Sequence, residues 1–355
     1  MDHRAGARGV RRRAALKSLP DPKPTRNHRR ALDPATPTAL APTSNSYDRF
    51  STGLEEQEHH VSIEEIRRLI TTHAHKEDLG LPGVRINRIT DPTQPTPSIA
   101  EPILAFSMQG AKRIALADRV YDQVPGAFMT VAVDLPITGH YVRASRAEPY
   151  LGFALELRSS SIAELLVEAA SGLPGILTPP PPGISINPAT PEMLDAVARL
   201  LALIERPVDA PVLAPLLERE ILWRVLSGPA GPTVRQIGLR DSSLTYIGRA
   251  IRHLRSNAFE PIQVEELAQL SGMGISSFHK QFRAVTAMSP IQYQKRIRLQ
   301  EARLQLFKRP HDIAAVAHSV GYSSASQFSR EYRREFGVAP SADALRMCEE
   351  GQATA

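Results

Sequence analysis

Two short clusters of polar and basic residues near the C-terminal end of the chain carry side chains suited to contacting a nucleic acid. Their hydroxyl, amide and imidazole groups exchange hydrogen bonds, and their cations can neutralise phosphates. Such side chains contact phosphates and base edges when a helix lies in the major groove of DNA. The clusters therefore indicate recognition of double-stranded DNA. The candidate contacts are Ser276, Ser277, His279, Lys280 and Arg283 in the first cluster and Ser324, Ser326, Gln327, Arg330 and Arg333 in the second.

The two clusters belong to an internal repeat within residues 262–340. The segment Leu267–Met273 aligns with Val316–Tyr322 at an offset of 49 residues, and from Phe278 and Phe328 onward the offset is 50. One extra residue in the second turn accounts for the change. A single polar helix face would be read as merely solvated, but a matched pair of such faces favours a shared binding function.

Each copy has the order of elements that a helix-turn-helix unit requires. A short apolar helix is followed by a small residue, Gly272 or Gly321, at which the chain can turn sharply. A second helix is expected to start at Ser276 or Ser324, because serine is a favoured N-cap. Its aromatic residues recur at helical spacing and are expected to pack in the core. The polar candidates fall on the opposite face, where a recognition helix would meet DNA.

The residues before and between the copies predict the helices that position them. Ser243–Leu254 has the spacing of a leading helix, and Pro290–Phe307 reads as one continuous connecting helix. To read one duplex, the two recognition helices should lie about one DNA turn apart, on the order of 34 Å. We therefore predict a DNA-binding domain over residues 241–348, preceded by a Gly- and Pro-rich linker over residues 228–240.

The C-terminal block of about 100 residues closely resembles the AraC/XylS family of bacterial regulators. The resemblance implies an all-helical module whose two recognition helices enter successive major grooves. It also implies control of transcription, with RNA polymerase as a partner. The segments that carry it are Leu267-Ala268, Ser271-Gly272-Met273, Phe278-His279-Lys280-Gln281-Phe282, Ser289-Pro290, Arg298-Leu299, Ala302, Val316-Ala317, Val320-Gly321-Tyr322, Gln327-Phe328-Ser329-Arg330 and Phe336-Gly337-Val338-Ala339-Pro340.

The chain departs from the family pattern at two positions of the first copy. Ala287 stands where the family usually has glycine, whereas Gly337 keeps the pattern in the second copy. If that position needs a positive φ, alanine costs about 1 kcal/mol relative to glycine. Gly274 stands where the family favours a serine cap, and glycine caps a helix at a loss of only a few tenths of a kcal/mol.

The preceding part of the chain changes to short β-rich runs separated by turn signals, which predict a small barrel or sandwich. Residues 84–225 also resemble the N-terminal sensing domain of one AraC subgroup, which implies a cupin-like β-barrel. The fold class is thus α+β in two domains: a cupin-like β-barrel with flanking helices over residues 60–227, and an all-α double helix-turn-helix domain. The predicted strands are Val84–Ile89, Ile103–Met108, Arg113–Leu116, Ala127–Leu135, Ile137–Val142 and Tyr150–Leu157, and the closing helices are Pro191–Ile204 and Pro211–Leu226.

A barrel of this kind could be a metal-dependent enzyme, which needs clustered His and carboxylate ligands on adjacent strands. Only His140 lies in the strand region, and Glu101 precedes a strand alone. No Ser-His-Asp, Cys-His or phosphate-loop arrangement can be assembled either. We therefore expect no catalysis, no metal and no cofactor in this domain. An enzyme fused to a helical domain, or a helical adaptor that binds protein, remains the alternative class.

The positive hypothesis for the barrel is a small organic effector bound in its apolar interior. For each candidate residue, plain core packing is the alternative reading. If no effector binds, a constitutive or partner-controlled regulator is the alternative. The two closing helices carry more apolar residues than one buried face needs, which suggests a homodimer. The effector candidates are Phe106, Met108, Phe128, Tyr141 and Phe153.

Composition bounds the remaining possibilities. The formal net charge is +6, and residues 1–50 alone carry 11 Lys and Arg against 4 Asp and Glu. Residues 1–55 are therefore expected to form a disordered, basic, Pro-rich tail. No run of 18 apolar residues is present, so no membrane span is expected. Cys348 is the single cysteine, which excludes an internal disulfide and favours a cytoplasmic protein.

Overall fold

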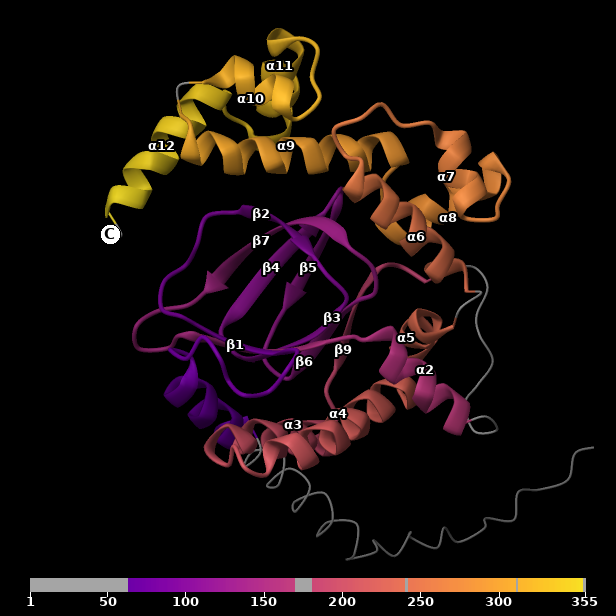
Figure 1. Cartoon of the computed structure of the whole chain (residues 1–355). Helices are drawn as coiled ribbons and strands as arrows, with labels where there is room; N and C mark the ends of the chain where they lie inside the picture. The colour runs from indigo at the N-terminus through magenta and orange to yellow at the C-terminus, as the bar shows by residue number, and fades with distance from the viewer. Residues whose placement is uncertain (1–62, 170–180, 240–241, 311, 354–355) are drawn as a thin grey trace, which may run out of the picture. The chain divides into compact units, whose positions relative to one another are not determined.

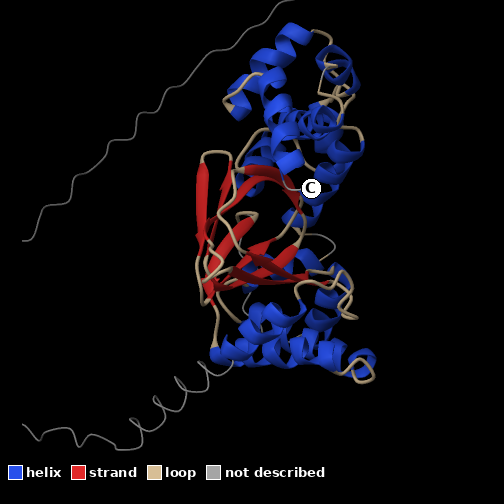
Figure 2. Cartoon of the chain, turned by 90° about the vertical axis from the view of Figure 1, so that its left-hand side faces the viewer, coloured by secondary structure: helices blue, strands red, loops and turns tan. Residues whose placement is uncertain are grey.

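The computed structural model describes residues 63–169, 181–239, 242–310 and 312–353, with side chains up to Met347. The predicted basic tail lies outside these residues. The described part of the N-terminal half contains two antiparallel sheets and flanking helices (Figures 1 and 2). Its strands are β1 (Val84–Ile89), β2 (Thr96–Ala100), β3 (Ile103–Gln109), β4 (Ala111–Leu116), β5 (Arg119–Gln123), β6 (Ala127–Val131), β7 (Leu135–Arg143), β8 (Tyr150–Glu156) and β9 (Ile184–Pro188).

One sheet has five strands in the order β1-β8-β3-β6-β9, and the other has four in the order β2-β7-β4-β5. The expected barrel with flanking helices is confirmed, and each of the six predicted runs contributes to a strand. The run predicted over Ala127–Leu135 is divided, because β6 ends at Val131 and β7 begins at Leu135. Strands β2, β5 and β9 were not predicted. All three lie at sheet edges, where prolines and polar residues replace the apolar pattern of a central strand.

The five-stranded sheet is buried on both faces. On one face it packs against the helix over residues 63–73 and against helices α3 (Pro191–Ala202) and α4 (Ala210–Ser227) (Figure 1). Thr190 caps α3 by accepting a hydrogen bond from the Met193 backbone N–H, with Pro191 in the first turn as predicted. Helix α2 (Ser159–Glu168) follows β8. Part of the predicted linker is helical and forms α5 (Gly231–Gly238).

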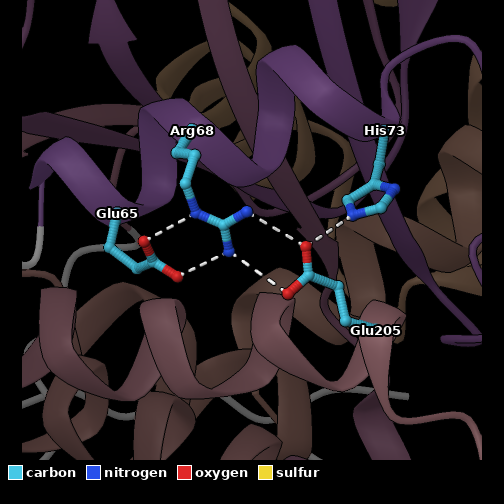
Figure 3. A network of polar contacts seen from close by, with 4 residues as sticks. All are labelled: Glu65, Arg68, His73 and Glu205. Carbon is cyan, nitrogen blue, oxygen red and sulfur yellow. Dashed lines mark hydrogen bonds and ion pairs between the residues drawn. The ribbon is translucent and has the colours of Figure 1, made fainter.

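A polar network ties the helix over residues 63–73 to the 3-10 turn Leu203–Glu205 that follows α3 (Figure 3). The guanidinium of Arg68 donates hydrogen bonds to the carboxylates of Glu65 and Glu205, at N···O distances of 2.8 to 3.2 Å. The same carboxylate of Glu205 lies 3.1 Å from Nε2 of His73. Hydrogen bonds from Arg68 and His73 lower the pKa of Glu205 from 4.5 to about 2.

The network should therefore contribute to stability in a pH-dependent way. Because the folded-state pKa of Glu205 is depressed, its contribution is present above pH 4.5 and is lost as pH falls towards 2. Replacing Glu205 by Gln should lower the urea midpoint at pH 6, modestly, because the carboxylate is partly exposed. The difference from the wild type should shrink as pH falls. A constant difference between pH 6 and pH 2.5 would contradict the assignment, and Asp209→Asn serves as a nearby control.

The helices of the described C-terminal part are joined by short turns and loops, and this part contains no strand. The predicted connecting helix is confirmed to within one residue and begins with a capping box between Ser289 and Gln292. The last helix was not predicted. No described helix is long and apolar enough to cross a membrane. The helices are α6 (Ser243–Ser256), α7 (Val264–Leu270), α8 (Ile275–Thr286), α9 (Pro290–Lys308), α10 (Ile313–Ser319), α11 (Ala325–Phe336) and α12 (Pro340–Ala353).

Candidate nucleic-acid interface

The first helix-turn-helix unit consists of α7, a tight turn and α8. The turn passes through Gly272, which has a φ of +61°. Phe278 and Phe282 lie on the inner face of α8 and are fully buried. The helix starts two residues earlier than predicted, with Gly274 rather than Ser276 at the N-cap. The residues predicted to contact DNA are all exposed, namely Ser276, Ser277, His279, Lys280 and Arg283.

The second unit repeats this geometry with α10 and α11. Its turn passes through Gly321, with a φ of +83°. Ser324 is the N-cap as predicted, and its hydroxyl accepts a hydrogen bond from the Gln327 backbone N–H at 3.3 Å. Phe328 and Tyr332 form the buried inner face. The five predicted contacts of this unit are likewise exposed: Ser324, Ser326, Gln327, Arg330 and Arg333.

Acidic and basic side chains of α11 are separated onto different faces. Glu331 pairs with Lys295 of α9 at 2.8 Å, and Glu335 pairs with Arg296 of α9 at 2.6 Å. Burial alone would raise the pKa of Glu331, but hydrogen bonds from Lys295, Tyr322 and Gln327 outweigh it and lower the pKa. The Glu331 carboxylate therefore stays ionised, and α9 supplies the cation that pairs with each of the two acidic side chains. The cations on the exposed faces of α8 and α11 form no ion pair with another described residue, namely Lys280, Arg283, Arg330 and Arg333.

Arg298 of α9 fixes the second unit against the first, a role that sequence reasoning missed. Its guanidinium donates to the backbone carbonyls of Ala258 and Glu260, in the loop after α6, at 2.7 and 2.8 Å. It also donates to the carbonyl of Gly321 at 3.0 Å. Gln294, one turn earlier, donates to the same two loop carbonyls. Arg298 thus joins α9 to the loop after α6 and to the turn of the second unit, and Gln294 adds to the attachment of α9 to that loop.

Helix α8 ends at Ala287, which has a left-handed backbone with a φ of +62°. Gly337 occupies the same position after α11, with a φ of +77°. The condition stated for this position in the sequence, a positive φ, is therefore met in both copies. Alanine is strained in this conformation, whereas glycine is not.

Replacing Ala287 by Gly should stabilise the protein by up to about 1 kcal/mol, because the strain of the left-handed alanine is removed. The converse change, Gly337→Ala, should destabilise it by a similar amount, since nothing lies within 4 Å of the added Cβ. Urea denaturation of both variants measures the two effects. If both substitutions stabilised the protein, or both destabilised it, this account would be contradicted.

A cavity of about 300 Å³ lies between the two sheets of the barrel. Phe106, Tyr141 and Phe153 line it. Met108 and Phe128 do not line it. The rings of Phe106 and Phe153 pack with Phe128 and Met108 in the core that the five-stranded sheet shares with the helices, so Phe106 and Phe153 border the cavity while their side chains belong to that core. The role of these residues in effector binding stays a prediction. Among the described residues, no group of three His, Cys, Asp or Glu side chains is placed to hold a metal ion.

Polar contacts and a shared core join the barrel to the first helix-turn-helix unit. Asp134, after β6, pairs with Arg255 of α6 at 2.5 Å, and its carbonyl accepts from the hydroxyl of Tyr293 at 2.8 Å. The backbone N–H of Gly183 donates to the carbonyl of Val285, near the end of α8, at 2.9 Å. Apolar residues of β4, β6 and β7 belong to the same buried cluster as those of α6 and α8. A change in the barrel can therefore reach a recognition helix through direct contacts.

Two families match this chain along most of its described length. Residues 80–233 match the AraC-type transcriptional regulator N-terminus, and residues 267–344 match a helix-turn-helix domain. The chain is 30% identical over 164 residues to the HTH-type transcriptional regulator ExsA of Pseudomonas aeruginosa, covering 46% of this chain and 58% of that protein. It is 33% identical over 87 residues to the transcriptional activator RhaS of Pectobacterium carotovorum subsp. carotovorum, covering 24% and 31%. The chain therefore spans less than two thirds of the length of these relatives.

Similarity extends to solved structures. ToxT from Vibrio cholerae, bound to an unsaturated fatty acid, aligns over 74% of this chain and 94% of its own, with 12% identity and a TM-score of 0.45. A probable AraC family transcriptional regulator from Rhodopseudomonas palustris aligns over 29% of this chain and 96% of its own, with 32% identity and a TM-score of 0.27.

Proposed function

We propose, from the premise that this chain belongs to the AraC family of transcriptional regulators, that it binds promoter DNA sequence-specifically with α8 and α11 in adjacent major grooves. One observation carries the proposal most: both recognition helices present exposed polar side chains and cations without carboxylate partners among the described residues. The chain would act in the cytoplasm together with RNA polymerase. Like its RhaS relative, which is named an activator, it would activate transcription.

The exposed residues should divide into two functional groups. Lys280 and Arg333 are expected to contact phosphates and so to set affinity and its salt dependence. His279, Gln327 and Arg330 are expected to contact base edges and so to set sequence choice. In the free protein the Gln327 amide lies 3.3 Å from Glu331, a weak contact that binding could exchange for a base.

Fluorescence anisotropy of the full chain tests this division. An operator would be selected from random duplexes, and a scrambled duplex would serve as the control. Lys280→Ala should weaken binding to both duplexes and reduce the salt slope by about one. Gln327→Ala should weaken operator binding by about 1–3 kcal/mol and leave the scrambled duplex unaffected. Equal loss on both duplexes for Gln327→Ala would contradict the division. Failure of the wild type to prefer any selected duplex would contradict the proposed function.

A small organic effector bound in the barrel cavity would control DNA binding. The direct contacts from the barrel to α6 and α8 support this part of the proposal. A ligand that changed the spacing of the two sheets would act on Asp134 and Gly183, and through them on the first recognition helix. DNA anisotropy with and without bound ligand is the test. Unchanged DNA affinity would favour a constitutive or partner-controlled regulator.

The chain would also form a homodimer through α4. The apolar residues that suggested a dimer are mostly buried within the N-terminal domain, including Leu194, Ile221 and Leu222. Val212, Leu216 and Trp223 instead form an exposed stripe along α4, with exposed fractions of 68%, 59% and 39%. A second copy would cover this stripe. Light scattering should give the mass of a dimer for the wild type and of a monomer for Leu216→Glu. A monomer mass for both proteins would contradict the dimer.

A further inference from the structure

We propose that the barrel cavity binds a small organic monoanion, a ring-sized or branched carboxylate, and that Lys112 pairs with its charge. The proposal rests on the proposed function, because it names the ligand class of the effector site. Lys112 belongs to β4, where it stands opposite Tyr141 of β7 and Gln123 of β5. Cross-strand neighbours share one face of a sheet, and all three residues line the cavity. The next residue, Arg113, lies on the opposite face and pairs with Asp122 outside.

Lys112 has no counter-ion within the described part of the chain. Its Nζ lies 5.2 Å from the ring centroid of Tyr141, which is a cation–π contact. Glu101 also lines the cavity but forms no ion pair with Lys112. Burial lowers the pKa of the Lys112 ammonium. A mostly buried cation without a carboxylate is costly, and an anionic ligand would supply the missing charge.

The remaining walls suit the apolar body of such a ligand. The rings of Tyr141 and Tyr150 lie 4.6 Å apart at one end, and Met129 and Ile137 contribute aliphatic surface. Gly152 makes room for the Tyr150 ring, because a Cβ there would lie 2.8 Å from it. Near 300 Å³, the cavity is at the lower end of small-molecule sites. Its size therefore favours one ring or a short branched chain over a long chain.

The anion site is tested with matched probes on the full-length chain. Benzoate, cyclohexanecarboxylate and isovalerate would be titrated calorimetrically beside their uncharged amides, against the wild type and two variants. Lys112→Met removes the charge and keeps much of the side-chain volume. Arg113→Met removes a charge from the outer face of the same strand and is the control. At least one carboxylate should bind the wild type more tightly than its amide. Lys112→Met should weaken that carboxylate by about 10- to 100-fold, while Arg113→Met leaves it unchanged.

The outcomes separate this proposal from the proposed function. Three results would overturn the anion site. The wild type could bind a carboxylate and its amide equally, or Lys112→Met could bind the carboxylate as tightly as the wild type does. The wild type could also bind no carboxylate up to about 1 mM. The wild-type comparison of acid with amide decides the question even if Lys112→Met fails to fold. A carboxylate that binds through Lys112 without changing DNA anisotropy supports the anion site and overturns effector control. If an amide changes the DNA affinity and no carboxylate does, the anion site is overturned, whereas control of DNA binding by an effector is supported.

Discussion

Replacing Gly321 by Ala should destabilise the second helix-turn-helix unit by more than about 2 kcal/mol and abolish its contribution to DNA binding. A Cβ added there would lie 2.3 Å from the carbonyl oxygen of Phe259 and 3.1 Å from Cζ of Arg298. The backbone oxygen cannot move aside without shifting the loop after α6. The φ of +83° adds strain of about 1 kcal/mol for any side chain. Urea denaturation followed by operator anisotropy measures both losses.

The first copy provides a matched control for this substitution. Gly272 occupies the aligned turn position and also has a positive φ, +61°, but nothing lies within 4 Å of its added Cβ. Gly272→Ala should therefore cost only the backbone strain, about 1 kcal/mol, and leave operator binding nearly intact. If the two substitutions cost the same, the close approach to Phe259 does not hold the second turn in place.

This contrast shows that the two units are not equivalent copies. The second turn rests on the loop of the first unit, where Arg298 and Gln294 bind the same backbone carbonyls. Each unit nevertheless has a separate apolar core. The pair can therefore present two recognition helices at a fixed distance, although damage to one core need not unfold the other.

The helical domain could be predicted from sequence because its signals are local. A capping box marks the start of α9, and Ser324 caps α11. Recognition helices alternate between a buried aromatic face and a polar face, so exposure followed directly from spacing. The strands of the barrel were harder to predict from the sequence. Its edge strands β2, β5 and β9 lack apolar alternation, and the central strands are buried on both faces, so sequence could not tell which side faces the cavity.

The residues that sequence reasoning missed act through long-range contacts. The guanidinium of Arg298 binds the backbone carbonyls of residues 38 and 40 positions before it and 23 positions after it. Every residue has a backbone carbonyl, so a sequence does not show which of them a side chain binds. Nothing in the sequence distinguishes Lys112 from its neighbour Arg113. Only the register of β4 with β5 and β7 places Lys112 inside the barrel and Arg113 outside.

Replacing Asp343 by Ala should destabilise the second core by about 3–5 kcal/mol, because the change leaves a mostly buried cation unpaired. The Asp343 carboxylate is fully buried at the start of α12. It accepts hydrogen bonds from Arg303 of α9 at 2.8 Å, from the Tyr332 hydroxyl of α11 at 2.8 Å and from Arg346 at 2.6 Å. One side chain thus joins three helices of the second unit. Hydrogen exchange should rise in α10 to α12 and stay unchanged in α6 to α8.

The pH dependence of this site and a control variant distinguish ion pairing from simple packing. Burial alone would raise the pKa of Asp343, but Tyr332 and Arg303 outweigh it and hold the pKa below 3.8. The stabilisation is therefore present above pH 3.8 and is lost as pH falls below it, so the wild type and Asp343→Ala should converge in acid. Arg346→Met removes the partner that is 45% exposed and should cost no more than about 1 kcal/mol. A loss as large as that of Asp343→Ala would mean that the surface pair, rather than the buried contact with Arg303, holds the second unit together.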